Sequence, residues 1–416
     1  MELAFSNTIP PHGRVYKTEQ GDEAVISLNE ETGNIFGTLK TNDGKSFALE
    51  KCQNGYIFEE FDVHAFPAEE GELDGNFARA LSPKMVFDRN EIVTYSVMFY
   101  YTPEFAATTP NVRDFVDQVV AETNQGYVNS QIPLRVKAFC TEQATVTDDE
   151  SSSVVLTNFR NMKSSLEELR NTADAAALLV NKFDACGRGY LHTYASGLTL
   201  TVTQKSCALG YYSFGHELGH NFGATHNTET STNSRFSYGH GHLISPTGAS
   251  KWSGYRTIMA YFADGHYERV NYYSNPNVNY PGTGTPTGVA DKSDNARVFV
   301  ENRHSFAGLG DESGVCNDGS APAITTTTTT TTTTAAAPAT GSKDIHHTSE
   351  LDFKVSKLLK LIEKFQVAKL QVEKLVISPS HTLAIPTKSA WSIVEMIGAE
   401  LILDGVFALV LAMRML

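Results

Sequence analysis

The sequence predicts an α/β fold, with a twisted and mostly parallel sheet over residues 92–312 and a small β-rich segment before it. Two observations predict this fold. From Ile92 onward, short apolar runs alternate with segments whose apolar residues recur at helical spacing, as in sheets built from strand–helix–strand units. Residues 24–62 instead hold short alternating runs, and the dipeptides between them suit tight hairpin turns: Thr32-Gly33, Asp43-Gly44 and Asn54-Gly55.

The elements of the α/β region follow from their apolar patterns. Long runs of branched and aromatic residues predict strands at 94–102, 134–140, 176–183, 189–196 and 198–204. Apolar residues spaced three and four apart predict helices at 111–127 and 158–171. A further helix is expected to follow the last of these strands.

Changes in composition divide the chain into five parts. These are a β-rich segment (1–65), an acidic linker (66–91), the α/β domain (92–312), a threonine-rich linker (313–342) and a helical tail (343–416). The threonine-rich linker contains an unbroken run of ten threonines, which cannot build a core and is typical of an O-glycosylated stalk.

The tail is expected to form a lysine-rich amphipathic helix at 351–376. Such a helix could bind a partner helix or an anionic membrane surface, or it could belong to a small helical domain. An apolar run at 405–413 has only nine residues, whereas a membrane span needs about twenty. Membrane association is therefore expected to be weak.

Charge and cysteine content limit the classes of function. The formal net charge is −14, so no basic surface remains to neutralise phosphates, and nucleic-acid binding is not expected. The five cysteines are too few for a disulfide scaffold, and their odd number leaves one over. The first twenty residues lack the basic and apolar parts of a secretion signal.

The most informative stretch is HELGHNFGATH, residues 216–226. On a helix, His216 and His220 lie one turn apart on one face, so both can bind one metal ion, with Glu217 beside them as a proton acceptor. Gly223 permits a left-handed turn that ends the helix and brings His226 to the same ion. Three protein ligands with an open fourth position are typical of a catalytic zinc, Zn²⁺.

Chance does not account for this pattern. Its five fixed residues would occur at random in about one of 10⁴ chains of this length. A second motif follows at 256–262, RTIMAYF, in which Met259 can form an apolar floor beneath the three histidines. Together with YYSNPNV (272–278) and GVADKSDNARVF (288–299), these segments resemble the metzincin clan of zinc endopeptidases, of the reprolysin-like and peptidyl-Asp metallopeptidase type.

The resemblance covers about residues 92–308 and implies a zincin fold. In that fold an α+β domain carries the active-site helix against the sheet, and a smaller subdomain follows Gly223. It also implies that protein or peptide substrates pair antiparallel with an edge strand, which we place at 189–194, and are cleaved with Glu217 as general base. Tyr261 would stabilise the transition state. The alternative is an inactive binding or adhesion protein on the same fold, which the intact Glu217 disfavours.

The resemblance gives the β-rich segment the role of a prodomain in a zymogen. Cys52 in that segment could block the metal as a cysteine switch, or be a buried thiol or disulfide partner. A Cys186–Cys207 disulfide is the first expectation, with Cys140–Cys316 and Cys186–Cys316 as rivals. Disulfides and a threonine stalk suit an extracellular location, so we expect a secreted protein whose N-terminus is incomplete here.

Several polar residues have weaker support. His240 and His242 are expected to be structural or solvent-facing, and His192 could contact substrate. Enzymes of the peptidyl-Asp type favour acidic side chains beside the cleaved bond, which requires a cationic pocket. The candidates for it in the second half of the domain are Arg235, Lys251 and Arg256.

Overall fold

The structure is a computed structural model, which describes strands between residues 13 and 74 and the span 91–316 apart from 150, 232–233, 246–252 and 262–265. The acidic linker outside 73–74 and 91, the threonine run and the tail lie outside the described residues. In the described part, no helix is long and apolar enough to cross a membrane.

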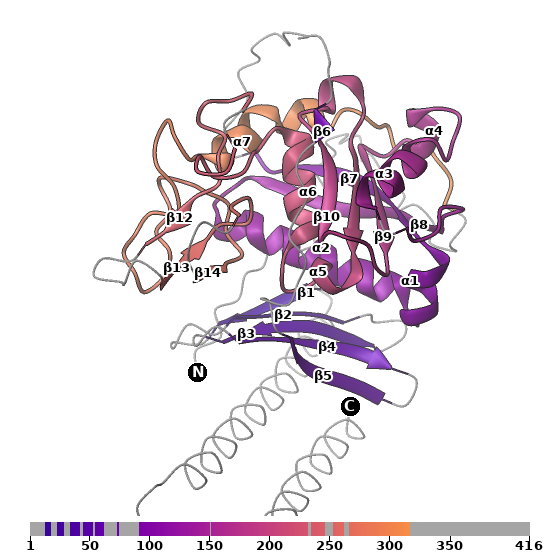
Figure 1. Ribbon diagram of the computed structural model, residues 1–416, viewed down its shortest axis with the longest axis horizontal. Helices are drawn as coiled ribbons and strands as arrows, with labels where there is room; N and C mark the ends of the chain where they lie inside the picture. The colour runs from indigo at the N-terminus through magenta and orange to yellow at the C-terminus, as the bar shows by residue number, and fades with distance from the viewer. Residues whose placement is uncertain are drawn as a thin grey trace, which may run out of the picture. The chain divides into compact units, whose positions relative to one another are not determined.

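The N-terminal segment forms a five-stranded antiparallel meander, one strand more than the sequence predicts (Figure 1). Its strands pair in chain order: β1 (Gly13–Lys17), β2 (Glu23–Leu28), β3 (Ile35–Lys40), β4 (Ser46–Cys52) and β5 (Gly55–Phe61). Buried polar contacts join the meander to helix α2 (Val112–Asn129): Ser27 donates to the Gln118 amide oxygen at 2.7 Å, and Thr38 donates to Glu122.

A six-stranded sheet in the order β6-β10-β11-β9-β7-β8 forms the centre of the molecule. Its strands are β6 (Leu73–Asp74), β7 (Val93–Tyr101), β8 (Leu134–Gln143), β9 (Ala175–Val180), β10 (Gly187–Leu191) and β11 (Leu200–Gln204). The inner pairs β11–β9, β9–β7 and β7–β8 are parallel, and β10 runs antiparallel to β11. The mixed α/β class with a mostly parallel sheet is therefore confirmed.

The outermost strand of this sheet comes from the acidic linker. Leu73 pairs with Tyr190 and Asp74 with Leu191, so β6 lies along β10 in the parallel direction. No strand was predicted in this linker, because two residues are too few to form a periodic pattern.

Two predicted boundaries are wrong. The helix expected over 158–171 is two helices, α3 (Ser152–Arg160) and α4 (Leu166–Arg170), because the chain turns at 161–165, where Ser165 caps α4 by accepting from the Glu168 N–H at 3.1 Å. The strand expected over 189–196 leaves the sheet after Leu191. His192 there has φ of 53°, and a 3₁₀ turn, η2 (Tyr194–Ser196), follows.

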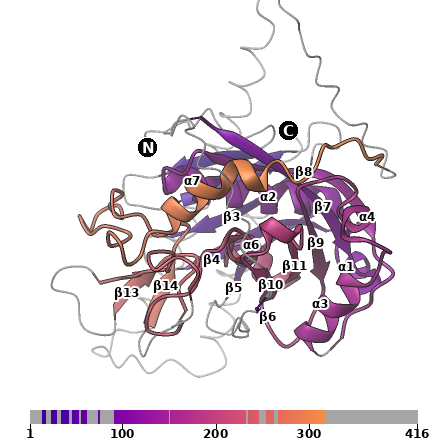
Figure 2. The same ribbon diagram turned by 90° about the horizontal axis from the view of Figure 1, so that it is seen from above.

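The remaining helices are α1 (Pro103–Thr108), α5 (Lys205–Ala208), α6 (Ser213–Phe222) and α7 (Asn295–Phe306). A three-stranded sheet follows α6 in the chain, with β12 (Leu243–Ile244) antiparallel to β13 (Ser253–Arg256) and β14 (His266–Arg269) parallel to it. In both views α6 lies between this small sheet and strands β7–β9 (Figures 1 and 2).

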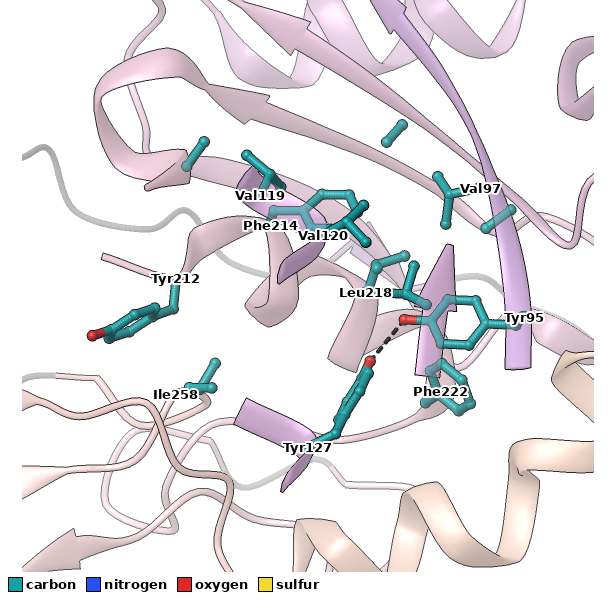
Figure 3. Packing of buried hydrophobic residues seen from close by; sticks show 14 of the residues in the cluster. Tyr95, Val97, Val119, Val120, Tyr127, Tyr212, Phe214, Leu218, Phe222 and Ile258 are labelled. Atoms are coloured by element: carbon teal, nitrogen blue, oxygen red, sulfur yellow. Dashed lines mark hydrogen bonds between the residues drawn. The ribbon is translucent and has the colours of Figure 1, made fainter. Parts of the chain in front are cut away.

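The main core is built of side chains from β7, α2, α6 and α7. Figure 3 labels some of those from β7, α2 and α6. Tyr95 and Tyr127 meet hydroxyl to hydroxyl at 2.7 Å inside it, so each buried phenol has a polar partner. Phe222, at the end of α6, stacks on Phe306 of α7 with ring centroids 3.8 Å apart. The apolar face of α6 is thus fixed from two sides, which holds its polar face in place.

Two disulfides join distant segments of the domain. Cys186, just before β10, bonds to Cys207 in α5, and Cys140 in β8 bonds to Cys316. The fifth cysteine, Cys52, ends β4 opposite Gly55, and its side chain lies outside the described part of the chain.

Candidate metal centre

Helix α6 places two histidines on one buried face. His216 and His220 are separated by one helical turn, and their Nε2 atoms lie 3.0 Å apart. The helix ends at Gly223, whose φ of 102° is left-handed and whose N–H donates to the His220 carbonyl at 2.9 Å. A side chain at 223 would also meet the His192 ring, because a Cβ there would lie 2.5 Å from its Nδ1. Glycine is therefore required by both conformation and space.

The turn after Gly223 brings in the third histidine. The Nε2 atom of His226 lies 3.0 Å from that of His220 and 3.2 Å from that of His216. A tetrahedral zinc with Zn–N bonds of 2.0–2.1 Å sets its ligand atoms about 3.3 Å apart, so the spacing fits. Within the described residues, these three histidines are the group of metal-binding side chains that lie close enough to hold one ion.

The tautomer of His220 also favours a metal. His220 Nδ1 lies 3.0 Å from the Ala224 carbonyl, which can only accept, so Nδ1 carries the proton and Nε2 presents a lone pair to the other two histidines. His216 Nδ1 lies 2.8 Å from the Ile258 carbonyl and 3.1 Å from Arg269 Nη2. Burial, followed by the charges of His220 and Arg269, lowers the pKa of His216 well below its usual value, which keeps that ring neutral.

Glu217 is buried beside the histidines and faces strand β10. Two glycines of that strand make room for it: a Cβ at Gly187 would lie 2.5 Å from Glu217 Oε1, and one at Gly189 would lie 3.2 Å from Oε2. These two glycines were not among the residues predicted from the sequence. The available signal was C-G-R-G-Y at 186–190, two glycines in a strand, which indicates a close approach by another group.

Met259 and Tyr261 line the site from the segment that follows β13. Met259 is fully buried, and its sulfur lies 2.5 Å from where a Cβ of Gly219 would be, so the thioether packs against α6 between the two helical histidines. The Tyr261 ring stacks on the ring of His226, with centroids 3.5 Å apart, and its backbone N–H donates to the Asn227 side chain at 2.8 Å.

The other sequence candidates lie around the centre without joining it. His240 is buried, and its Nδ1 lies 2.8 Å from the His226 carbonyl, so it supports the backbone of the third ligand. His192 packs edge-on to Phe236, and burial lowers its pKa to about 4. His242 is half-buried, and burial lowers its pKa.

Of the cationic candidates, Arg235 is exposed, Lys251 lies outside the described residues, and Arg256 is buried near His216. Arg256 is joined there by Arg269 and Tyr211, which the sequence analysis missed. Arg269 Nη2 lies 3.1 Å from His216 Nδ1. Only the pairing of β13 with β14 brings Arg269 to this place, and a pairing of short parallel strands leaves no local signal in the sequence.

Comparison with known proteins agrees with this geometry. Residues 93–274 match the profile of Metallo-peptidase family M12, of reprolysin type. The chain is 33% identical over 308 residues to the peptidyl-Asp metalloendopeptidase of Stenotrophomonas maltophilia strain R551-3, covering 68% of this chain and 69% of that protein. It is 32% identical over 186 residues to the enzyme of that name from Pseudomonas fragi, covering 45% of this chain and 98% of that protein.

A solved structure with remote resemblance to the chain comes from a bacterial metalloproteinase. Metalloproteinase-II from Bacteroides fragilis aligns with 51% of this chain and 73% of its own at 12% identity and a TM-score of 0.33, a likeness too weak to bear on the fold.

The fold, the three histidines and these relatives define a metalloendopeptidase. The chain belongs to the reprolysin-like metallopeptidases. Because the relatives bear the names of enzymes, the alternative of an inactive binding protein is not favoured.

Proposed function

We propose that the protein is a zinc-dependent endopeptidase in which His216, His220 and His226 hold the ion and Glu217 is the general base. The observation that carries the proposal is the convergence of three Nε2 atoms within 3.0–3.2 Å, with the buried Glu217 one position along the same helix. When bound, zinc polarises the scissile carbonyl and acidifies water.

The protein's own residues then move the protons. Glu217 accepts the proton of the attacking water and later delivers it to the leaving amine. Its position between α6 and the glycines of β10 fixes the carboxylate relative to the histidines. Tyr261 is proposed to stabilise the developing negative charge with its hydroxyl, and its stacking on His226 supports this role.

The substrates are proposed to be proteins or peptides with an acidic residue beside the cleaved bond, since the relatives are named peptidyl-Asp metalloendopeptidases. An extended substrate would pair antiparallel with β10 on the side away from β11, which β6 occupies in this structure. We also propose that the protein is secreted, which two disulfides support.

We propose that residues 1–91 are a prodomain that keeps the enzyme latent. The support is β6, which lies along the edge of β10 where the substrate strand would lie. β6 runs parallel to β10, whereas a substrate would run antiparallel to it. The peptide bonds of β6 therefore point in the opposite N-to-C direction from those of a substrate at the same edge. The cysteine switch at Cys52 remains a prediction beside this one.

A peptide-library digest with the purified protein tests the proposed function. Cleavage that a chelator abolishes and added zinc restores is expected, and the Glu217→Ala variant should bind zinc and cleave nothing. Wild-type cleavage that resists the chelator, or no cleavage by any processed form, would exclude a zinc endopeptidase.

A further inference from the structure

Strands β10 and β11 stop pairing before β10 ends. The last pair between them is Gly189 opposite Thr201, whereas β10 continues to Leu191 and β11 begins at Leu200. The last two residues of β10 and the first residue of β11 therefore lie beyond the pairing. This is the part of β10 that lies closest in the chain to the left-handed turn at His192.

Asn221 of α6 reaches the point where the two strands separate. It is the residue after His220 in the chain, and its side chain is fully buried. Its amide nitrogen Nδ2 donates to the Tyr190 carbonyl at 2.7 Å and to the Leu200 carbonyl at 3.4 Å. An amide nitrogen carries two hydrogens, so it can serve both carbonyls at once. Asn221 thus joins both strands to the helix at this point.

A second hydrogen bond joins the end of β10 to the same turn of α6. The N–H of His192 donates to the carbonyl of His220 at 2.6 Å. Helix and strand lie beside each other in both views (Figures 1 and 2). The two hydrogen bonds fix residues 190–192 to the turn of the helix that carries the second histidine of the metal centre.

The opposite side of β10 is the edge along which β6 pairs with Tyr190 and Leu191. In an extended strand, the backbone polar groups of one residue point to one side and those of its neighbours to the other. The Tyr190 carbonyl points inward, to Asn221, so the polar groups of Gly189 and Leu191 point to this outer edge. A substrate that pairs with β10 would use the same groups.

We propose that Asn221 is a positioning residue that aligns the substrate-binding edge of β10 with the metal centre. It holds Tyr190, which lies between the two residues whose backbone groups face the substrate, while His220 beside it holds the metal. Without the amide, the end of β10 can shift relative to the histidines, and a misplacement of about 1 Å can lower turnover by about 10²-fold. The inference rests on the proposed function, in which an extended substrate pairs with β10.

The test compares a long peptide, with several residues on each side of the cleaved bond, and a blocked short peptide that contains only the two residues flanking it. Only the long peptide can pair with β10. Asn221→Asp keeps the shape of the side chain but replaces the donor with a carboxylate that only accepts, and Asn221→Ala removes the group. Each variant is assayed as the active form obtained from the full chain.

Both variants are expected to lower kcat/KM by about 10–10²-fold for the long peptide and by less than about 3-fold for the short one. Zinc content should stay at the wild-type level, because the three histidines are unchanged. The ratio of the two kcat/KM values is the decisive readout, since a general loss of stability lowers both values together.

Asn124→Asp and Asn124→Ala are the matched controls. Asn124 of α2 is also a fully buried helix asparagine, and its amide exchanges hydrogen bonds of 2.8 and 2.9 Å with the backbone of Val136. Val136 lies on β8, at the other edge of the sheet from β6 and β10. These changes should leave the ratio of the two kcat/KM values as it is in wild type.

Three results would overturn the inference and leave the proposed function intact. The first is a long-to-short ratio in the Asn221 variants that equals that of wild type. The second is loss of zinc in both Asn221 variants, which would show that the residue holds the metal-binding helix and not the substrate edge. The third is a wild-type enzyme without preference for the long peptide. Absence of any chelator-sensitive cleavage by wild type would overturn the proposed function together with the inference.

Discussion

Glu217 lies so close to Gly187 that a single added carbon at position 187 would reach within 2.5 Å of its Oε1 atom. The two residues come from different elements, α6 and β10, and the strand is joined through Cys186 to the segment that leads into the helix. The position of the Glu217 carboxylate therefore depends on strand β10, although the β10 residue that it faces, Gly187, has no side chain.

Gly187→Ala should reduce activity without loss of metal. The added methyl group displaces the Glu217 carboxylate, and a misplacement of about 1 Å can lower kcat by about 10²-fold. Steady-state kinetics and zinc content check this together. Gly308→Ala is the control, because its nearest contact is a carbonyl at 3.3 Å outside the centre, and it should be nearly silent. Full activity in Gly187→Ala would mean that Glu217 does not need its present position.

Glu217→Gln should lower kcat by about 10²–10⁴-fold, since the amide cannot accept the proton of water. Zinc content should stay at the wild-type level, because the three histidines are untouched. The measurement is kcat beside metal analysis. His220→Ala is the comparison, since it should lose zinc and activity together. If Glu217→Gln kept more than about a tenth of the wild-type kcat, another group would have to be the base.

Leu73→Pro should weaken latency. Proline lacks the N–H and restricts the backbone, so β6 can no longer pair fully with β10. We expect the full chain with this change to cleave a quenched peptide with a shorter lag than wild type. A proline outside β6 in the same linker, Ala68→Pro, controls for general effects on the segment. Equal lags for the two variants would argue against a blocking role for β6.

The contact between the meander and α2 should depend on pH through Glu122. Burial raises the pKa of this carboxyl from 4.5 to about 7, against the opposing effect of hydrogen bonds from Thr38 and the Gly210 N–H. The folded protein therefore holds this proton more tightly than the unfolded chain does. The contribution of this proton to the free energy of unfolding is fully present below pH 4.5 and is lost as the pH rises through about 7.

Urea unfolding at pH 5.5 and pH 8 measures this effect. Glu122→Gln, which cannot ionise, should remove a loss of about 2 kcal/mol that wild type shows between these values. Thr38→Val, which removes one hydrogen bond and leaves the carboxyl, should keep the pH dependence. An identical pH dependence in wild type and Glu122→Gln would show that Glu122 ionises freely in the folded state.

The convergence of the three histidines was predictable because its signal is local. His216, His220 and His226 lie within eleven residues, so helix geometry and one left-handed glycine bring them together without help from the rest of the chain. The same reasoning predicted the meander, whose turns are encoded by adjacent pairs of residues.

Features that depend on pairing between distant segments were not predicted. The register of β13 with β14 places Arg269 beside Arg256, and the pairing of β6 with β10 joins residues more than a hundred positions apart. Strand β10 also ends earlier than its apolar pattern suggests, since His192 adopts a left-handed conformation as it packs against Gly223. In each case the determining partner is remote in the chain, so no window of sequence contains the information.

The Cys140–Cys316 bond determines where a pulling force would enter the domain. Cys316 is the last described residue before the threonine run, and it is bonded to the middle of β8. Tension applied to anything attached beyond this point passes directly into the central sheet through a covalent bond. Helix α7, which supports α6, lies inside the loop of chain that this bond closes. A force applied beyond Cys316 therefore reaches β8 through the disulfide as well as α7 through the backbone.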